Sequence, residues 1–184
     1  NLKAPELYEE KKKDISEIRV KITKLSDERT AVLLMITEIE KRKHAVFMET
    51  YNAIADNFKK LYSTTIKEGD AMLVLENPSD PFSGGLSIKV RSANHDKHIE
   101  SMSGGEKSLM AIVFVFAIQL YKPAPFYVLD EVDAALDKEN SKKLSALVAS
   151  MAKKTQFIVV THNDAMLTAA ETAIGVTMTE EGSK

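Results

Sequence analysis

Two adjacent carboxylates, Asp130 and Glu131, directly follow the apolar run of residues 126–129. Such a run is typical of a buried strand, which would deliver Asp130 to the carboxyl edge of a parallel sheet. There Asp130 could bind Mg²⁺ directly or through water, and Glu131 could orient or deprotonate a water that attacks a phosphate. Taken alone, the pair fits equally well with a solvated loop that caps the next helix.

A second polar group follows another apolar run. Residues 157–161 are expected to form a strand, and His162 comes directly after it. One helix separates this strand from the one before Asp130, so a right-handed crossover places the two strands adjacent or one apart. His162 and Glu131 are then expected to converge on one phosphate, although a lone histidine at a strand end is usually a surface or hydrogen-bonding residue.

A third candidate site begins an apolar helix. Ser103 and Glu106 have the spacing of a capping box, in which each side chain accepts a hydrogen bond from the other residue's backbone. Gly104 and Gly105 stand between them, and glycines weaken a first helical turn unless a group must approach the backbone closely. Free amide groups at a helix N-terminus, with a serine hydroxyl beside them, could bind a phosphate. The two interpretations are compatible.

The elements that must position these residues follow from hydrophobic periodicity. Two strands with period-two alternation are expected at 71–75 and 86–90, joined by a segment rich in proline and glycine. Beyond residue 100, helices and strands alternate, which predicts a parallel α/β sheet. We expect helices at 104–121, 138–152 and 164–172, and strands at 126–130, 157–161 and 173–178. Residues 95–98, of sequence His-Asp-Lys-His, fit an exposed loop without an assigned function.

The sequence pattern of the N-terminal third predicts one long helix, over about residues 6–60. Apolar residues recur every three or four positions, and no glycine or proline interrupts the stretch between Pro5 and Gly69. Such a helix is longer than an ordinary amphipathic helix packed on a globule, so its apolar seam should need a partner helix. The seam positions are Ile15, Ile18, Ile22, Leu25, Arg29, Val32, Ile36 and Ile39.

Composition excludes several classes of protein. The chain has 184 residues, no cysteine and a net charge of −2. A disulfide framework, a thiolate metal site and a cysteine nucleophile are therefore excluded. Neither the net charge nor its distribution suggests a strongly basic nucleic-acid-binding domain. No apolar run approaches the length of about 20 residues that a membrane-spanning helix needs, and no secretory signal is evident.

In this order, these motifs resemble the ATPase head of SMC (structural maintenance of chromosomes) proteins, which are ABC-type ATPases. Residues 103–107 (Ser-Gly-Gly-Glu-Lys) match the ABC signature, with Met102 where the family usually has leucine. Residues 126–131 resemble Walker B, 134–137 the D-loop, and His162 the switch histidine. The stretch 122–137 is the most specific match, 80–86 also looks SMC-like, and Thr161 before His162 looks more like prokaryotic members.

One element of the family is absent from this sequence. No segment has the spacing G-x-x-x-x-G-K-[ST] of the Walker A loop, which cradles the β-phosphate. In SMC proteins this loop lies in an N-terminal segment that returns along the coiled coil. We therefore expect the chain to be the C-terminal half of a head. The expected fold is α/β, with a coiled-coil arm over residues 1–57 and a C-terminal lobe with a mainly parallel sheet over residues 58–184.

The resemblance implies that two complete heads enclose two ATP molecules. Asp130 would bind Mg²⁺, Glu131 would activate water and His162 would sense the γ-phosphate. On the opposing head's nucleotide, Ser103, Gly104 and Gly105 would hold the γ-phosphate, and Asp137 would cross the interface. The implied cofactors are ATP and Mg²⁺. The implied partners are the N-terminal half of the head, a second SMC head, a kleisin subunit and DNA, in the cytoplasm at the nucleoid and without a membrane.

Two other functions remain open from sequence. The chain could belong to a coiled-coil ATPase of double-strand-break repair, or it could be a structural coiled-coil module with a degenerate site. The consecutive apolar residues 32–36 are a further open point. These residues could bind the N-terminal helices of a kleisin. Alternatively, the head or the returning N-terminal helix could cover them, and this second interpretation is slightly favoured.

Overall fold

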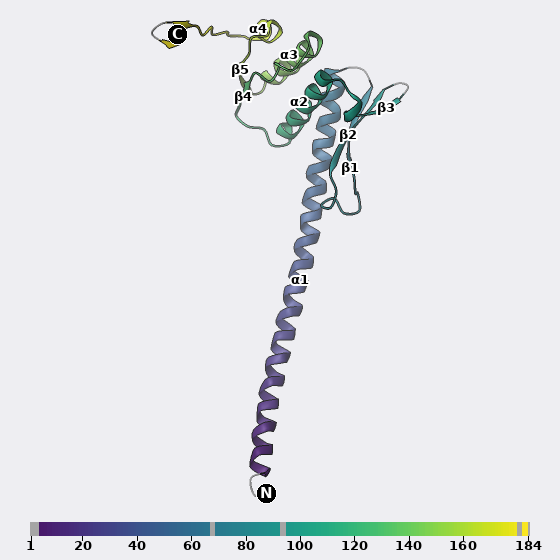
Figure 1. Ribbon diagram of the computed structural model, residues 1–184, viewed down its shortest axis with the longest axis vertical. Coiled ribbons are helices and arrows are strands. Elements are labelled where there is room, and N and C mark those ends of the chain that lie inside the picture. Colours follow the sequence, from purple (N-terminus) through teal and green to yellow (C-terminus); the bar gives the residue numbers. More distant parts are fainter. Residues whose placement is uncertain (1–3, 67–68, 93–94, 180–181, 184) are drawn as a thin grey trace. The chain divides into compact units, whose positions relative to one another are not determined.

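The computed structural model describes residues 4–66, 69–92, 95–179 and 182–183, which form two compact units. The first unit comprises Asn1–Glu49 and the second Thr50–Lys184. Helix α1 (Ala4–Thr65) begins in the first unit and ends in the second (Figure 1). The long N-terminal helix predicted from the heptad pattern is therefore confirmed. The two compact units divide between Glu49 and Thr50, and the expected arm over residues 1–57 stays a prediction.

Within the first unit, α1 exposes its apolar seam. Ile15, Ile22 and Leu25 are each more than half exposed. Ion pairs between neighbouring turns, such as Lys43 Nζ with Glu40 Oε2 at 2.7 Å, lie on the helix surface. Surface pairs of this kind contribute only a few tenths of a kcal/mol, so most of the stability of such a helix must come from packing of its apolar face.

The last turns of α1 belong to the core of the second unit. Phe58 is fully buried and packs edge-on against Phe114, with ring centroids 6.2 Å apart. Phe114 lies on helix α2 (Gly104–Tyr121), beside the end of α1 in Figure 1. The Asn57 side chain also donates a hydrogen bond to the carbonyl oxygen of Ala117. This packing explains why the unit boundary falls before residue 57.

A three-stranded antiparallel sheet covers the same core. Its strands are β1 (Asp70–Leu75), β2 (Leu86–Ser92) and β3 (His95–His98), in that order, and the short 3₁₀ helix η1 (Ile99–Ser101) follows. The two strands predicted at 71–75 and 86–90 are confirmed. The loop expected at 95–98 is wrong, because this segment pairs with β2 as an edge strand although it has no alternating apolar pattern.

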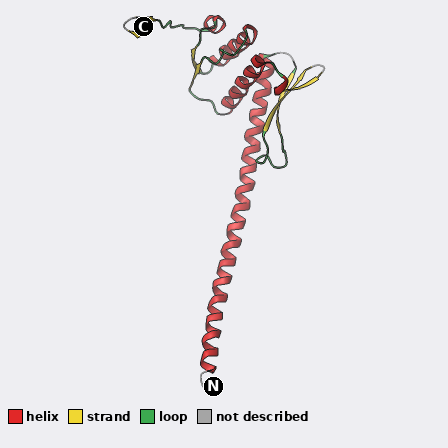
Figure 2. Ribbon diagram, viewed as in Figure 1, coloured by secondary structure: helices red, strands yellow, loops and turns green. Residues whose placement is uncertain are grey.

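The second sheet is one parallel pair, β4 (Phe126–Asp130) and β5 (Gln156–Val160), in which Asp130 is aligned with Val160 (Figure 2). Helix α3 (Lys138–Ala152) connects them, and helix α4 (Asp164–Ala169) follows β5. The expected adjacency of these two strands is confirmed. Leu144 and Leu147 on α3 and Met166 on α4 are buried in the shared core.

The expected mainly parallel sheet is wrong for the described residues, where the sheets are small and the larger one is antiparallel. The strand expected at 173–178 is also wrong, because residues 173–177 have no regular structure. Ile174 is 85% exposed and Val176 is 75% exposed, so no neighbouring strand pairs with them and β-propensity alone does not form a strand. Only β6 (Met178–Thr179) forms, paired with β7 (Gly182–Ser183).

Among the described residues, α2 is the one helix long and apolar enough to cross a membrane by length and composition. Its residues Leu109, Val113 and Phe116 are nearly or fully buried in the core of the second unit. A core helix of a globular domain passes the same test, so we interpret α2 as a core helix.

Candidate functional site

The start of α2 is a capping box. The Ser103 hydroxyl accepts a hydrogen bond from the Glu106 backbone N–H at 3.3 Å, and the Glu106 carboxylate accepts one from the Ser103 backbone N–H at 2.9 Å. The expected helix start at Ser103 is confirmed. Because its side chain is exposed, Ser103 is also accessible to a ligand or to another protein.

The two glycines that follow Ser103 differ in their surroundings. A Cβ atom at Gly105 would lie 3.2 Å from Asn140 Nδ2 and 3.3 Å from Asp137 Oδ2, so α2 and the start of α3 approach closely there. A Cβ atom at Gly104 would meet nothing within 4 Å. Packing among the described residues therefore explains why position 105 is glycine, but it does not explain the glycine at position 104. A glycine that lets a group from another molecule approach the backbone would have this property.

Asp137 caps α3 beside this pair of glycines. Its Oδ1 accepts a hydrogen bond from the Asn140 backbone N–H at 2.8 Å, and its Oδ2 accepts one from Asn140 Nδ2 at 3.0 Å. Ser103, Glu106, Asp137 and Asn140 line one surface groove. The structure thus brings Asp137 together with the signature residues Ser103, Gly104 and Gly105; we call these four residues the signature group.

Asp130 and Glu131 stand where β4 ends. Both side chains are exposed, and the Glu131 backbone N–H extends the parallel pairing by donating to the carbonyl oxygen of Val160 at 2.9 Å. Glu131 has a φ of 46°, in the left-handed region that non-glycine residues rarely adopt. Such strain persists only where the surroundings enforce it and often marks a functional turn.

His162 follows β5 and faces this turn. Its Nδ1 lies 3.8 Å from Glu131 Oε1, and the two side chains are 78% and 54% exposed. The structure therefore brings Glu131 and His162 together at the sheet edge, and their convergence on one phosphate and their chemical roles stay predictions. Together with Asp130 they form a second group, which we call the strand-end group.

The donor set can be tested for Mg²⁺. Among the described residues, no cluster of three or more histidine, cysteine, aspartate or glutamate side chains could hold a metal ion. Mg²⁺ usually keeps several waters and binds through one or two carboxylates plus substrate phosphates. A single exposed carboxylate, Asp130, fits a metal that arrives with a phosphate ligand and does not fit a cage made only of protein.

Sequence reasoning missed one buried set of polar residues beneath the strand-end group. Asp133 is only 4% exposed, and its Oδ2 accepts a hydrogen bond from the Thr161 hydroxyl at 2.7 Å. Asn163 donates from its backbone N–H to the Thr161 hydroxyl oxygen and from its side chain to Ser141 Oγ. The available signal was an aspartate in the first turn after Glu131, but nothing in sequence distinguishes a buried aspartate there from a solvated one.

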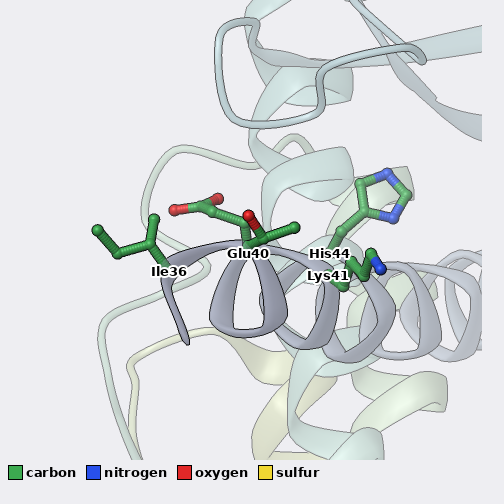
Figure 3. A pocket seen from close by; sticks show the side chains of 5 residues that line it. Ile36, Glu40, Lys41 and His44 are labelled. Atoms are coloured by element: carbon green, nitrogen blue, oxygen red, sulfur yellow. The ribbon is translucent and has the colours of Figure 1, made fainter. Parts of the chain in front are cut away.

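A depression on the first unit carries no comparable chemistry. It is lined by Ile36, Thr37, Glu40, Lys41 and His44, all from α1 (Figure 3). These positions share one face of a single helix, so the depression has no second wall among the described residues of that unit.

The comparisons with known proteins agree with these motifs. A family model described as "RecF/RecN/SMC N terminal domain" matches residues 6–184. The chromosome partition protein Smc of Pyrococcus furiosus is 48% identical over the whole chain, and the Synechococcus sp. Smc is 43% identical over 96% of it. The chain belongs to the SMC family. It spans 16% and 15% of the lengths of these two SMC relatives.

Solved SMC heads share the fold. The Smc head domain of Pyrococcus yayanosii with a coiled coil and joint matches with a TM-score of 0.83 and 46% identity, over 100% of this chain and 36% of that one. The Smc head domain of P. furiosus bound to the C-terminal domain of ScpA matches with a TM-score of 0.78 and 48% identity, over 91% and 42% of the two chains. The fold is therefore a mixed helix and strand ABC ATPase head fold with a long N-terminal helix.

The comparisons also correct one expectation. The matching SMC model is described as an N-terminal domain, so it does not support the expected placement of the chain as the C-terminal half, or C-terminal lobe, of a head. The order of motifs could not decide this point, because a motif's position in a longer protein is not encoded in the motif itself. The relatives at 43% and 48% identity are chromosome partition proteins.

Proposed function

We propose that this chain forms part of an SMC ATPase head that hydrolyses ATP to drive chromosome partition. The observation that carries the proposal is the position of Glu131 and His162, which meet 3.8 Å apart at the carboxyl ends of two adjacent parallel strands. Ligands of open α/β sheets bind outside this edge. A carboxylate and an imidazole together there suit the activation of a water that attacks a phosphate.

Each member of the strand-end group has a distinct role in the proposed reaction. Asp130 would hold Mg²⁺, which would supply positive charge beside the phosphates of ATP. Glu131 orients the attacking water and accepts its proton, and His162 contacts the γ-phosphate. Because both side chains are more than half exposed, a nucleotide and a water have room between them and the rest of the site.

The remainder of the ATP site must come from another segment of the head, which carries the Walker A loop absent here. Apolar surface on the parallel pair supports this inference. Phe126 and Val128 on β4 and Ile158 and Val160 on β5 are each about half exposed. Parallel strands are normally covered on both faces, and exposed apolar patches of this kind usually contact another element or protein.

The signature group acts on the nucleotide of a second head in this proposal. The α2 amides beyond Gly104 and the Ser103 hydroxyl bind the γ-phosphate of that nucleotide, because a helix N-terminus favours an anion. Asp137 crosses the interface between the heads. The open space beside Gly104 supports this role, since a Cβ atom there would meet nothing within 4 Å among the described residues and another chain can approach this side.

The first unit is the coiled-coil arm in this proposal, and its exposed seam pairs with a second helix. A kleisin subunit and DNA are the proposed partners of the whole assembly, in the cytoplasm at the nucleoid. Among the similar solved structures, Smc heads of 48% and 50% identity are bound to parts of ScpA, and another concerns ATP-driven dimerization and DNA-stimulated activation of SMC ATPases.

The proposal is tested by comparing the chain alone with a complete head that adds the Walker A segment. We expect the chain alone neither to bind ATP at micromolar concentration nor to hydrolyse it, because the missing loop supplies most phosphate contacts. The complete head should do both. Micromolar binding by the chain alone would overturn the proposed division of the site, and an inactive complete head would favour the degenerate structural module.

A mixing experiment tests the signature group. Ser103→Arg should block ATP-driven pairing of heads while ATP binding to a single head persists. A Ser103→Arg head mixed with a native head should lose one of the two shared sites. Loss of the helix cap alone would cost about 1 kcal/mol of stability, so equal loss of ATP affinity in the single head would instead indicate a folding defect.

A further inference from the structure

The strand-end group adjoins a part-buried hydrogen-bonded network that holds both of its loops. The Thr161 hydroxyl donates to Asp133 Oδ2 at 2.7 Å, which joins the loop after β5 to the loop after β4. Asp133 is 4% exposed, and a hydrogen bond is stronger in the protein interior than in water. This contact therefore links the loops that carry His162 and Glu131, in addition to the backbone hydrogen bond from Glu131 N–H to the Val160 carbonyl oxygen.

On the His162 side, the network anchors both neighbours of the imidazole. Thr161 precedes His162, and Asn163 follows it and donates its backbone N–H to Thr161 Oγ1 at 2.9 Å. The Asn163 side chain donates to Ser141 Oγ at 3.0 Å and accepts from the Ala165 backbone N–H at 3.0 Å. Ser141 is fully buried on α3, so the His162 backbone is fixed on both sides by contacts to the core.

On the Glu131 side, the network holds a strained turn. Glu131 has a φ of 46°, and its carbonyl oxygen accepts a hydrogen bond from the Ala134 backbone N–H at 3.0 Å. The Asp133 carbonyl oxygen accepts one from the Leu136 backbone N–H at 3.0 Å. Asp133 thus lies inside this turn with its side chain anchored to Thr161. A non-glycine residue keeps such a conformation only when its surroundings enforce it.

The exposed side chains of Glu131 and His162 cannot be positioned by packing of their own. They are 54% and 78% exposed, and their contact at 3.8 Å is weak in solvent. Their relative position is instead determined by the two backbone segments that carry them. We propose that Asp133 and Thr161 are positioning residues for ATP hydrolysis: their hydrogen bond sets the distance between the water-activating carboxylate and the phosphate-contacting imidazole. This inference rests on the proposed function.

The experiment uses the complete head and a matched set of variants. Thr161→Val removes the hydroxyl at nearly constant shape, and Thr161→Ser retains it. Ser145→Ala is the control, because the buried Ser145 hydroxyl donates at the same 2.7 Å to the Ala165 carbonyl oxygen and contacts neither loop end. Thr161→Val also removes the acceptor of the Asn163 backbone N–H, so it should lower thermal stability more than Ser145→Ala does, and kcat is the readout that tests the positioning role.

We expect Thr161→Val to lower kcat about tenfold or more with the KM for ATP unchanged, because misplacement of reacting groups costs rate without weakening substrate binding. Thr161→Ser should restore kcat to within about twofold of the native value, and Ser145→Ala should leave kcat unchanged. A native kcat in Thr161→Val, or an equal loss in Ser145→Ala, would overturn the proposal, because either result would leave the bond with only a structural role.

Two further variants keep the test decisive. If Thr161→Val does not fold, Asp133→Asn replaces it, since its amide oxygen still accepts a hydrogen bond but without the charge; kcat should fall about threefold at unchanged KM. A native kcat in Asp133→Asn would then overturn the proposal. Glu131→Gln separates the two hypotheses: if it retains native activity the proposed function fails, whereas if it is inactive and Thr161→Val is native only the positioning role fails.

Discussion

Glu131 Oε1 and His162 Nδ1 lie 3.8 Å apart, although the whole of α3 separates the two residues along the chain. The contact follows from β4 and β5 being adjacent parallel strands, which end at the same edge of their sheet. It makes Glu131 the residue whose substitution is most informative about the proposed reaction.

Glu131→Gln in the complete head should abolish most ATP turnover and leave ATP binding intact, because the amide keeps the shape of the carboxylate but cannot accept the proton. The engaged pair of heads should accumulate, which gel filtration with ATP would measure. Glu171→Gln is a suitable control, since Glu171 is an exposed glutamate outside both the strand-end group and the signature group. Turnover at the native rate in Glu131→Gln would show that another group activates the water.

The two glycines of the signature group should respond differently to alanine. Gly104→Ala should fold with equal or greater stability, because its new Cβ meets nothing within 4 Å and alanine favours a helix over glycine by about 0.5–1 kcal/mol. ATP-driven pairing of heads should nevertheless weaken if a second head approaches there. Thermal unfolding and gel filtration measure the two effects.

Gly105→Ala is the matched variant for this comparison. Its Cβ would lie 3.2 Å from Asn140 Nδ2 and 3.3 Å from Asp137 Oδ2, so the start of α3 must shift and stability should fall. Native pairing in a stable Gly104→Ala head would contradict the proposed role of this backbone in the contact between heads.

Tyr51 should make the stability of the head sensitive to alkaline pH. Burial raises the pKa of Tyr51 above its ordinary value of 10.0, and a backbone hydrogen bond from Leu75 opposes this shift. The folded state therefore favours the neutral phenol, whose hydroxyl donates to the Leu73 carbonyl oxygen at 2.8 Å. The contribution of Tyr51 to the stability of the folded state is fully present below pH 10.0, the pKa of this tyrosine in the unfolded chain. It is lost as the pH rises through the pKa of Tyr51 in the folded state.

Urea unfolding of the complete head at several pH values measures this dependence. Tyr51→Phe should cost about 1 kcal/mol at neutral pH and should remove part of the alkaline loss of stability. Tyr8→Phe provides a control because Tyr8 is exposed on α1. An identical alkaline loss in native and Tyr51→Phe heads would show that other groups cause it.

Three consecutive apolar residues of α1 test the proposed kleisin contact. Leu33, Leu34 and Met35 are each at least half exposed. Their joint replacement by glutamine should weaken kleisin binding to the complete head and neck while ATPase activity persists, because exposed apolar patches mark binding surfaces. Val20→Gln, at another exposed apolar position of α1, is the control. Unchanged kleisin affinity in a folded triple variant would favour the alternative that another helix covers these residues.

The amino-acid sequence by itself determined the features that depend on neighbouring residues. The Ser103 and Glu106 pair specified the start of α2, because both partners of a capping box lie within one turn. Two apolar runs, each followed by polar residues, specified β4 and β5, and the crossover rule placed these strands adjacent or one apart; the structure shows them adjacent. The heptad pattern specified α1 in the same way, since side chains three and four residues apart share one face.

Only the tertiary structure decided the features that depend on distant partners. Residues 95–98 form a strand because β2 offers them a free edge, and residues 173–177 do not form one because, within the described part of the chain, no strand pairs with them. Asp133 could not be recognised as buried until Thr161 supplied its hydrogen-bond partner from another strand end. Burying a carboxylate without a hydrogen-bond partner costs free energy of folding. Whether an aspartate is buried therefore depends on a partner that its own segment does not contain.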